Sequence, residues 1–349
     1  MIPHSCPCIG RKEEQAVTQV LRSQHIKGGE LCRQFERRVA AAQGYRYGIT
    51  TATGSHAIEI ALRIMFADKK ARVGISGYLC RSVYDAIVRA RCIPVLTDAD
   101  PVHFGPDLKM ISRKKMDAVI VAHLFGVRVP LGPYLKTGVP IIEDCAQRVL
   151  PNAAREPDRG IMRILSFEAT KLLTCGEGGM LLLDDEELQA EGRKIRAGSY
   201  DTPRIASWCS LTDIQAALAN VQWSRLEKFI QKRREIAAAF METIGRRHQQ
   251  HIHPAMQFED TIYYRFILRV KSPPQFIEAG ARSGVVFRRP IAPLPLGKLF
   301  RHRVKCRNTE TLMNTLVSIP IYPALNRKDM LKIIAATNAA LDMAPGRLQ

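Results

Sequence analysis

Six short apolar segments recur between residues 72 and 183, and they limit the possible fold more than any other feature of this sequence. Stretches with helical periodicity separate several of them, and another such stretch, 57–65, precedes the first. Strands that alternate with helices predict a largely parallel sheet that is covered by helices on both faces. The sequence therefore predicts an α/β fold, with strands over 72–75, 93–97, 118–122, 139–143, 161–166 and 179–183.

The remainder of the chain predicts a second, smaller domain, because 349 residues are too many for one compact core. Residues 211–244 have the pattern of one or two long helices, with Thr212 as N-cap and Gly245 as the end. Beyond about residue 253 the pattern becomes mixed. We expect a large domain over 1–235 and a small α+β domain over 236–349. Within the small domain the pattern predicts strands at 261–270 and 284–287 and helices at 274–283 and 327–341.

The formal net charge of +19 is unusual for a chain with this pattern. The basic residues are dispersed in small clusters without interleaved aromatic residues, and no nucleic-acid-binding module is present, so we expect no nucleic-acid partner. An anionic small-molecule substrate accounts for the same charge. No apolar run approaches the roughly 18 residues of a membrane-spanning helix, and no secretory signal is apparent.

Cysteine usage points to a reducing compartment. The nine cysteines are scattered, and an odd number without framework spacing indicates reduced thiols in a cytoplasm. Cys6 and Cys8 form the single close pair in the sequence. Because no second pair and no histidine cluster accompanies them, we expect no bound metal.

An aspartate, a serine and a lysine follow the ends of predicted strands, where parallel sheets bind their ligands. Asp144 ends the run Ile-Ile-Glu-Asp, Ser166 ends the next predicted strand, and Lys171 follows shortly before a glycine-rich stretch. This combination predicts a pyridoxal phosphate (PLP) site, with an amine for the Schiff base and a carboxylate for the pyridine nitrogen. Upstream, Gly54 and Ser55 open a helix whose N–H groups would bind an anion, although an ordinary helix cap gives the same local pattern.

At these residues the chain resembles the DegT-type sugar aminotransferases, which share the aspartate aminotransferase fold. Order, spacing and residue types agree over nearly the whole chain. The resemblance implies a PLP-dependent homodimer that transfers an amino group from glutamate or glutamine to a keto-sugar, which we expect to be nucleotide-linked. The segments that carry the resemblance are 53–58, 94–98, 123–126, 141–147, 166–180, 213–217 and 318–323.

The resemblance also implies roles for individual residues. Lys171 corresponds to the Schiff-base lysine, which then serves as general base and for that role requires a depressed pKa. Asp144 corresponds to the partner of the pyridine nitrogen, and Gln147 to the residue near the phenolic oxygen of the cofactor. Relatives that catalyse deoxygenation carry histidine at the lysine position, so Lys171 favours transamination. The residues that correspond to phosphate contacts are Gly54, Ser55 and Ser166.

Two departures from the family pattern concern the cofactor. Cys80 stands where the family has an aromatic residue that stacks on the cofactor ring. Tyr78 would supply that ring from two residues away if both residues lie on a strand and face the same side, so we expect Tyr78 and Cys80 near the cofactor. Trp208, Cys209 and Ser210 replace an Asn-x-Arg that reaches from a neighbouring subunit into the site.

A third departure concerns the substrate. Arg288 and Arg289 replace the His-Tyr of a His-Tyr-Pro found near the substrate. Two arginines there would bind a diphosphate bidentately, and two solvated surface arginines are the equally weighted alternative.

Two functions remain at this point. The first is the sugar aminotransferase described above. The second is a regulatory or sensor protein on the same fold, suggested by the changes at Cys80, Trp208 and Ser210 and by the high positive charge. Lys171, Asp144, Gln147 and Ser166 are all retained, and they favour the enzyme.

Overall fold

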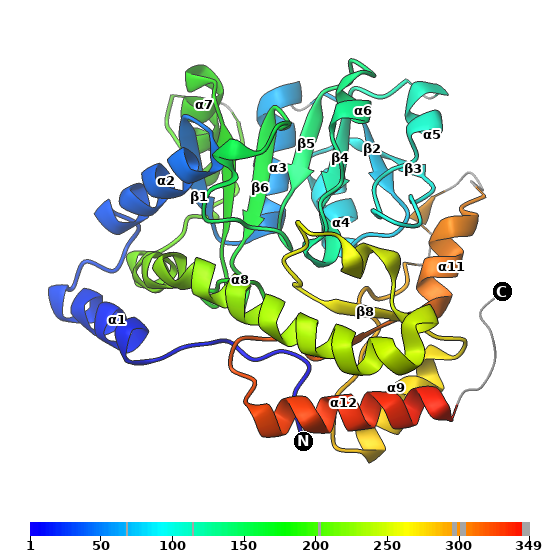
Figure 1. Ribbon diagram of the computed structural model, residues 1–349. Helices are drawn as coiled ribbons and strands as arrows, with labels where there is room; N and C mark the ends of the chain where they lie inside the picture. The colour runs from blue at the N-terminus through cyan, green and yellow to red at the C-terminus, as the bar shows by residue number, and fades with distance from the viewer. Residues whose placement is uncertain (68, 114, 202–203, 295–298, 301–304, 344–349) are drawn as a thin grey trace.

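The computed structural model describes residues 1–349 except 68, 114, 202–203, 295–298, 301–304 and 344–349 (Figure 1). Helices pack on both faces of a large sheet, and a smaller two-stranded sheet lies beside its lower edge in that view. The strands are β1 (Tyr47–Thr51), β2 (Arg72–Ser76), β3 (Ile93–Thr97), β4 (Ala118–Ala122), β5 (Ile141–Asp144), β6 (Met162–Ser166), β7 (Gly179–Leu183), β8 (Phe266–Arg269) and β9 (Leu316–Ile319). The helices are α1 (Arg11–Ser23), α2 (Glu30–Gln43), α3 (Gly54–Phe66), α4 (Arg81–Arg89), α5 (Leu108–Arg113), α6 (Gly132–Leu135), α7 (Glu186–Ala197), α8 (Asp213–His248), α9 (Pro273–Arg282), α11 (Arg307–Thr315) and α12 (Arg327–Asp342).

The large sheet has the strand order β1-β7-β6-β5-β4-β2-β3. Strand β7 is antiparallel to both of its neighbours, and all the other pairings are parallel. Six strands therefore run in one direction and end at the same edge of the sheet. The predicted α/β class with a mostly parallel sheet is confirmed, and the predicted strands 93–97, 118–122 and 179–183 coincide with β3, β4 and β7.

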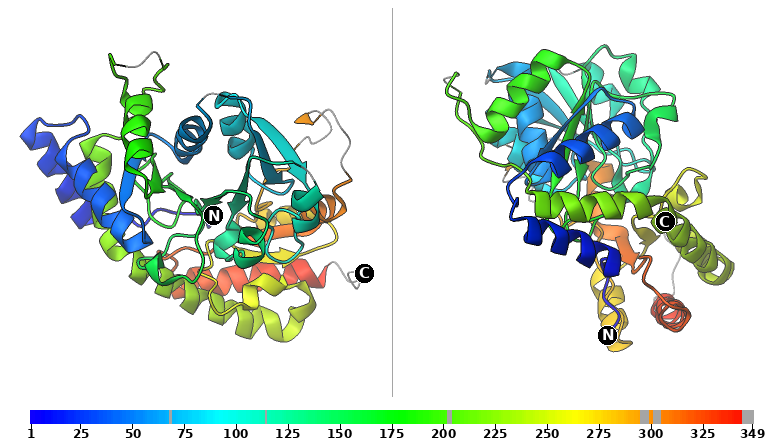
Figure 2. Two further views of the ribbon diagram at one scale, coloured as in Figure 1. Left: turned by 90° about the horizontal axis from the view of Figure 1, so that it is seen from above. Right: turned by 90° about the vertical axis from the view of Figure 1, so that its left-hand side faces the viewer.

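The alternation of side chains along β7 shows why helices cover both faces. Leu181 and Leu183 belong to one apolar cluster, which includes residues of α3 and α4. Met180 and Leu182 belong to another, which includes residues of α2 and α8. Successive residues of a strand point to opposite faces, so this five-residue strand contributes to two cores. Figure 2 shows the helices on the two sides of the sheet.

Helix α8 is a single helix of 36 residues. As predicted, Thr212 is the N-cap: its Oγ1 accepts a hydrogen bond from Gln215 N at 3.3 Å, and the Gln215 side chain bonds back to Thr212 N. The prediction that Gly245 ends the helix is wrong, because α8 continues to His248. A glycine inside a helix costs roughly 1 kcal/mol, and here the burial of Ile244 and His248 on either side offsets that cost.

The C-terminal part of the chain contains the antiparallel pair β8–β9 with α9, α11 and α12 around it. The predicted strand 261–270 is only partly correct, because β8 starts at Phe266. The residues before it bond instead to another loop: Ile262 N and Arg265 N donate to the carbonyls of Gly126 and Phe125. The predicted strand 284–287 is wrong as well, since Val285 makes only an isolated bridge to Ile2.

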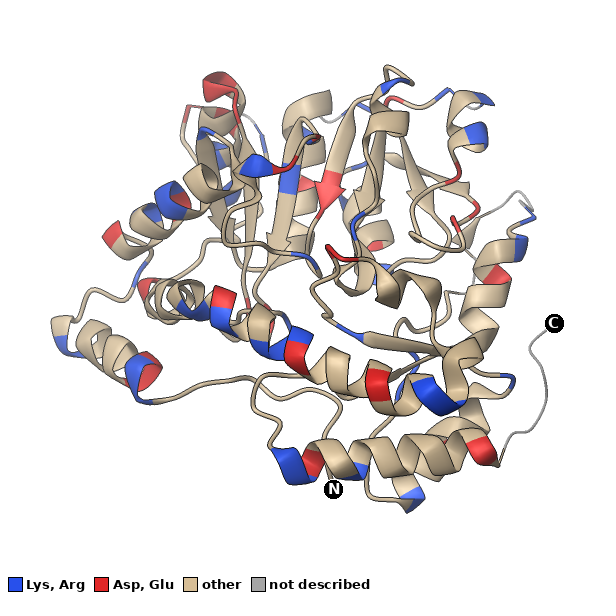
Figure 3. Ribbon diagram, in the orientation of Figure 1, with Lys and Arg blue, Asp and Glu red and all other residues tan. Residues whose placement is uncertain are grey.

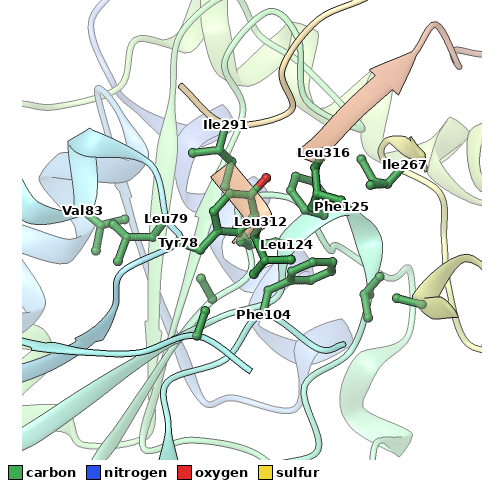
Figure 4. Close-up of a cluster of buried hydrophobic side chains, with 14 of the residues drawn as sticks. Tyr78, Leu79, Val83, Phe104, Leu124, Phe125, Ile267, Ile291, Leu312 and Leu316 are labelled. Atoms are coloured by element: carbon green, nitrogen blue, oxygen red, sulfur yellow. The ribbon is translucent and has the colours of Figure 1, made fainter. Parts of the chain in front are cut away.

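An apolar cluster joins the C-terminal part to the large sheet. Figure 4 shows Phe104, Phe125 and Tyr78 packed close to Leu312 and Leu316, and all five residues are buried. In addition, α8 runs without a break across residue 235. The division into domains at 235/236 thus remains a proposal about two parts that share one core.

Basic and acidic side chains are both dispersed over the molecule (Figure 3). Figure 3 shows Lys and Arg spread over most elements, with Asp and Glu interspersed. None of the helices in the described part of the chain is long and apolar enough to cross a membrane. Among the described residues no disulfide links any of the nine cysteines.

Candidate active site

The edge where the parallel strands end contains a cavity of about 250 Å³. Loops and helix starts that follow β1, β2, β4, β5 and β6 form its walls, which is where a mostly parallel sheet binds ligands. The structure brings together seven of the ten residues that the sequence singled out: Gly54, Ser55, Cys80, Asp144, Gln147, Ser166 and Lys171.

One end of the cavity is suited to an anion. Helix α3 begins there, its N-cap Thr53 accepts a hydrogen bond from His56 N at 3.2 Å, and the hydroxyls of Ser55 and Ser166 lie on the same wall. The first N–H groups of a helix lack intrahelical partners and bind anions. The close approach requires glycine: a Cβ on Gly54 would lie 3.0 Å from Ser166 Cβ, and one on Gly179 would lie 2.4 Å from the carbonyl of Thr53.

Asp144 is the last residue of β5 and contributes a buried carboxyl group to the cavity. Its Oδ1 accepts a hydrogen bond from Ala146 N at 3.0 Å. Burial raises the pKa of Asp144, and the Ala146 hydrogen bond and the nearby charge of Lys171 only partly oppose this rise. A buried carboxyl group with so little compensation is suited to pair with a cationic nitrogen of a ligand.

Lys171 lies in the loop after β6, where its backbone N donates to Glu168 O at 2.9 Å. Its Nζ lies 5.6 Å from the centroid of the Tyr264 ring. Burial pushes the pKa of Lys171 down, but attraction to Tyr264, Cys80 and Asp144 outweighs burial and raises it. The expectation of a depressed lysine pKa is therefore wrong for the protein alone, because these interactions outweigh the effect of burial.

Gln147 is held in place by the chain. Its Oε1 accepts a hydrogen bond from Phe125 N at 2.8 Å, and its Nε2 lies 3.8 Å from Cys80 Sγ. Cys80 is the N-cap of α4, and burial raises the pKa of its thiol. The side chains of Gln147 and Cys80 thus form one continuous wall.

The structure places Tyr78 away from the cavity. Strand β2 ends at Ser76, so Tyr78 and Cys80 do not share a strand face as expected. Tyr78 is 1% exposed, and its ring packs 5.9 Å from Phe104 and 6.1 Å from Phe125 (Figure 4). Its ring is part of the apolar cluster and does not line the cavity.

Arg288 and Arg289 do not line the cavity either. Arg288 is exposed, and its backbone forms a bridge with Ser318. Arg289 Nη1 donates to the carbonyl of Met313. Ser318 lies in β9 and Met313 lies in α11, so both arginines belong to the C-terminal side of the molecule.

The segment at 208–210 lies beside the end of β1, since Cys209 O accepts a hydrogen bond from Ala52 N at 2.6 Å. Trp208 is 78% exposed and has a φ of 47°, which is unusual for a residue with a side chain. The exposed Trp208 thus directly precedes a residue that is hydrogen-bonded to Ala52, next to the turn at 53–55.

Two groups of residues near the cavity were not predicted. The first is a buried network of His123, Glu143 and Arg163, in which His123 Nε2 donates to Glu143 at 3.0 Å. The possible metal-ligand atoms of His123, Glu143 and Cys145 lie within 4.8 Å of one another. Both nitrogens of His123 are already hydrogen-bonded, however, Nε2 to Glu143 and Nδ1 as acceptor from Val129 N. The second is a single residue, Arg265. The sequence could have indicated it, because Arg265 is a charged residue inside an otherwise largely apolar run.

The donor set of the cavity fits PLP: an amine, a carboxyl group that pairs with a cation, and a helix N-terminus with two hydroxyls for a phosphate. Comparisons with known proteins agree. The sequence profile of the DegT/DnrJ/EryC1/StrS aminotransferase family matches residues 7–338.

Individual relatives are similar over much of the chain. The spore coat polysaccharide biosynthesis protein SpsC of Bacillus subtilis is 29% identical over 267 residues, which are 68% of each chain. The PLP form of Spr1654 from Streptococcus pneumoniae has a TM-score of 0.89 at 19% identity and covers 99% of this chain and 100% of its own. The sugar aminotransferase CalS13 from Micromonospora echinospora has a TM-score of 0.84 at 19% identity, over 97% of this chain and 100% of its own.

Proposed function

The chain belongs to the DegT/DnrJ/EryC1/StrS aminotransferase family and is a PLP-dependent aminotransferase, and from this premise we propose that it aminates a nucleotide-linked keto-sugar with glutamate or glutamine as donor. The observation that carries the proposal is that Lys171 and Asp144 lie in one cavity with the N-terminus of α3. SpsC and CalS13, which belong to polysaccharide biosynthesis and sugar amination, support a sugar as the acceptor.

PLP, when bound, supplies an electron sink for the carbon that loses a proton. The residues that would hold it are Gly54, Ser55 and Ser166 at its phosphate and Asp144 at its ring nitrogen, where an ionised carboxylate keeps the nitrogen protonated. Lys171 would hold it covalently and, when released, move the proton as general base. Gln147, fixed by Phe125 N, would orient the ring from the side of Cys80.

The regulatory alternative receives less support. A protein that only senses a ligand needs no lysine beside a buried carboxyl group, and such a lysine and carboxyl group are both present in this cavity. The change at Cys80 leaves the other members of the wall in place. We therefore interpret Cys80 as a variation within an enzyme.

Arg288 and Arg289 are proposed to bind the diphosphate of the sugar nucleotide. Both belong to the C-terminal side of the molecule, and Arg288 is exposed. Arginine binds phosphate oxygens through two parallel hydrogen bonds, which gives geometric selectivity as well as charge.

We further propose a homodimer in the cytoplasm. Exposed apolar side chains occur at Tyr200, Ile205 and Trp208 in the segment between α7 and α8, and contact with a second copy would bury them. The scattered cysteine positions and their odd number support a reducing compartment. Light scattering of the purified protein tests the dimer, with Trp208→Ser as the variant expected to weaken it.

Two half-reactions test the proposed activity. The PLP-loaded protein is mixed with L-glutamate, and we expect loss of the visible absorbance of lysine-bound PLP together with formation of 2-oxoglutarate. A nucleotide-linked keto-sugar should then restore the absorbance and yield an amino-sugar nucleotide, identified by mass spectrometry. Absence of a spectral change with every amino donor tried would reject the proposal.

A further inference from the structure

Two buried arginines lie together in the C-terminal part, and neither has an acidic partner among the residues that the structure describes. Arg233 is 2% exposed, and its Nη1 donates to the backbone carbonyls of Tyr263, Tyr264 and Ile321. Arg265 is 8% exposed, and its Nη2 donates to the Tyr264 hydroxyl at 3.1 Å. Its buried Nη1 has no hydrogen-bond partner in the described part of the chain. Buried charges are normally paired, and an unmatched guanidinium nitrogen is costly. Within the described residues, neither arginine has a carboxylate partner.

Arg265 lies close to Lys171. The Arg265 guanidinium is centred 4.3 Å from the centroid of the Tyr264 ring, and Lys171 Nζ is 5.6 Å from the same centroid. The two distances add to 9.9 Å, which is therefore the upper limit for the separation of the two cationic groups. Both cationic groups therefore lie over the same ring, although Arg265 itself does not line the cavity.

A second connection leads from Arg265 to the cavity wall. Phe125 N donates to the side chain of Gln147 at 2.8 Å, and Phe125 O accepts from Arg265 N at 3.3 Å. One residue thus separates the backbone of Arg265 from the amide of Gln147. The charge of Arg265 also reaches the cavity, because it is one of the groups that lower the pKa of Cys80 against the larger effect of burial.

We propose that Arg265 binds the carboxylate of the amino donor, which makes it a specificity residue of the proposed aminotransferase. The proposal rests on the proposed function. An amino acid carries its amine and its carboxylate on the same carbon, so a donor whose amine replaces that of Lys171 brings a carboxylate close by. A buried guanidinium with a vacant Nη1 matches a planar carboxylate through a charge-assisted hydrogen bond. Arg233 lies near Arg265, because the charge of Arg265 is, after burial, one of the causes that lower the pKa of Arg233.

Binding of glutarate, which has the carboxylates of glutamate but no amine, tests the assignment without catalysis. Isothermal titration of the PLP-loaded protein should give a Kd that rises roughly 10- to 100-fold in Arg265→Gln. Arg265→Lys, which retains charge but not the planar fork, should fall between Arg265→Gln and the unaltered protein. Arg282→Gln is the matched control, because Arg282 is exposed and pairs only with Glu278 on α9.

Several outcomes separate this inference from the proposed function. Unchanged glutarate binding in both Arg265 variants would overturn the assignment. Weaker binding of UDP instead of glutarate would assign Arg265 to the phosphate of the sugar nucleotide and overturn it as well. Amino transfer from glutamate by the unaltered protein tests the proposed function alone. If Arg265→Gln does not fold, as judged by near-UV circular dichroism, Arg265→Lys decides, because it keeps the buried charge.

Discussion

Glu143 and Asp144 are neighbours in β5 with similar burial, 2% and 8% exposed, yet their surroundings are opposite. Burial alone would raise the pKa of Glu143, but the hydrogen bond from His123 and the charge of Arg163 lower it to about 2. Gly160 N donates to the same carboxylate at 2.8 Å. Asp144 faces the cavity with one backbone hydrogen bond, and burial raises its pKa.

The difference separates a structural carboxylate from one available to a ligand. Both carboxylate oxygens of Glu143 are hydrogen-bonded within the protein, so its charge stabilises the fold and is not available to a ligand. Asp144 is poorly compensated, and a cationic group that arrives in the cavity would complete its environment. If this distinction holds, replacement of Glu143 should mainly lower stability and replacement of Asp144 should mainly lower activity.

Lys171→Ala should have the largest effect. Transamination should be lost entirely, because no other amine can hold the cofactor covalently or move the proton. The free energy of unfolding should change little. Turnover and the mass of the borohydride-reduced protein measure the result, with the exposed Lys136→Ala as control. A reducible PLP adduct at full yield in Lys171→Ala would assign the attachment to another lysine.

Asp144→Asn should lower turnover by roughly 100- to 10,000-fold, since a neutral amide cannot keep the ring nitrogen protonated. In the cofactor-free protein its unfolding free energy should be unchanged or higher, because a buried and poorly compensated carboxyl group is removed. Turnover assays and urea denaturation test the two halves. Turnover near that of the unaltered protein would show that another acid performs this role.

Glu143→Gln is the matched change on the other side of β5 and should mainly reduce stability. It removes one of the two carboxylates that pair with buried Arg163, leaving Glu156 at 3.3 Å, and the loss of such a buried pair costs at most about 3–5 kcal/mol. Turnover at a temperature where the variant is folded should fall far less than in Asp144→Asn. Urea denaturation measures the loss. A stable but inactive Glu143→Gln would reverse the assigned roles.

Acid should act mainly through Glu143. Its folded-state pKa of about 2 lies below the usual 4.5, so its stabilisation is complete above pH 4.5 and is lost as the pH falls toward 2. The shift corresponds to about 3 kcal/mol. Denaturation midpoints between pH 6 and pH 2 should drop more steeply in the unaltered protein than in Glu143→Gln. Parallel pH curves for the two proteins would show that other carboxylates cause the acid sensitivity.

The joint replacement of Arg288 and Arg289 by Ala should have the smallest effect. The Michaelis constant for a nucleotide-linked keto-sugar should rise about tenfold or somewhat more, while turnover and the glutamate half-reaction stay nearly constant. Steady-state kinetics with each substrate measure this. If the sugar is handled normally, both arginines are merely solvated.

The sequence predicted the elements whose burial is uniform along the chain. All five residues of β4 are buried, so an unbroken apolar run marked both of its ends. Asp144 and Ser166 were found because polar residues follow such runs at the sheet edge. Residues 261–265 contain Ile262 and two tyrosines and look like the start of the strand that follows, but they bond to the loop at Phe125 and Gly126, a tertiary contact that no local pattern reveals.

The site was predicted less completely than the fold for the same reason. Glu143 and Asp144 are adjacent acidic residues that the sequence alone does not tell apart in role. Only the positions of Arg163 and Lys171 around them distinguish the structural carboxylate from the one in the cavity. Tyr78 was misplaced because β2 ends at Ser76, two residues before it. The role proposed for Arg265 rests on its lack of a carboxylate partner among the described residues, and a sequence cannot show that a partner is absent.

Gly179 has a consequence for how this protein can vary. Every replacement of a glycine by another residue introduces a Cβ, and at position 179 that atom would lie 2.4 Å from the backbone of Thr53. Gly179 does not line the cavity, so a survey of its lining residues would rate a replacement there as harmless. The collision would nevertheless displace the start of α3. The mutational tolerance of this cavity is thus limited at a position outside it.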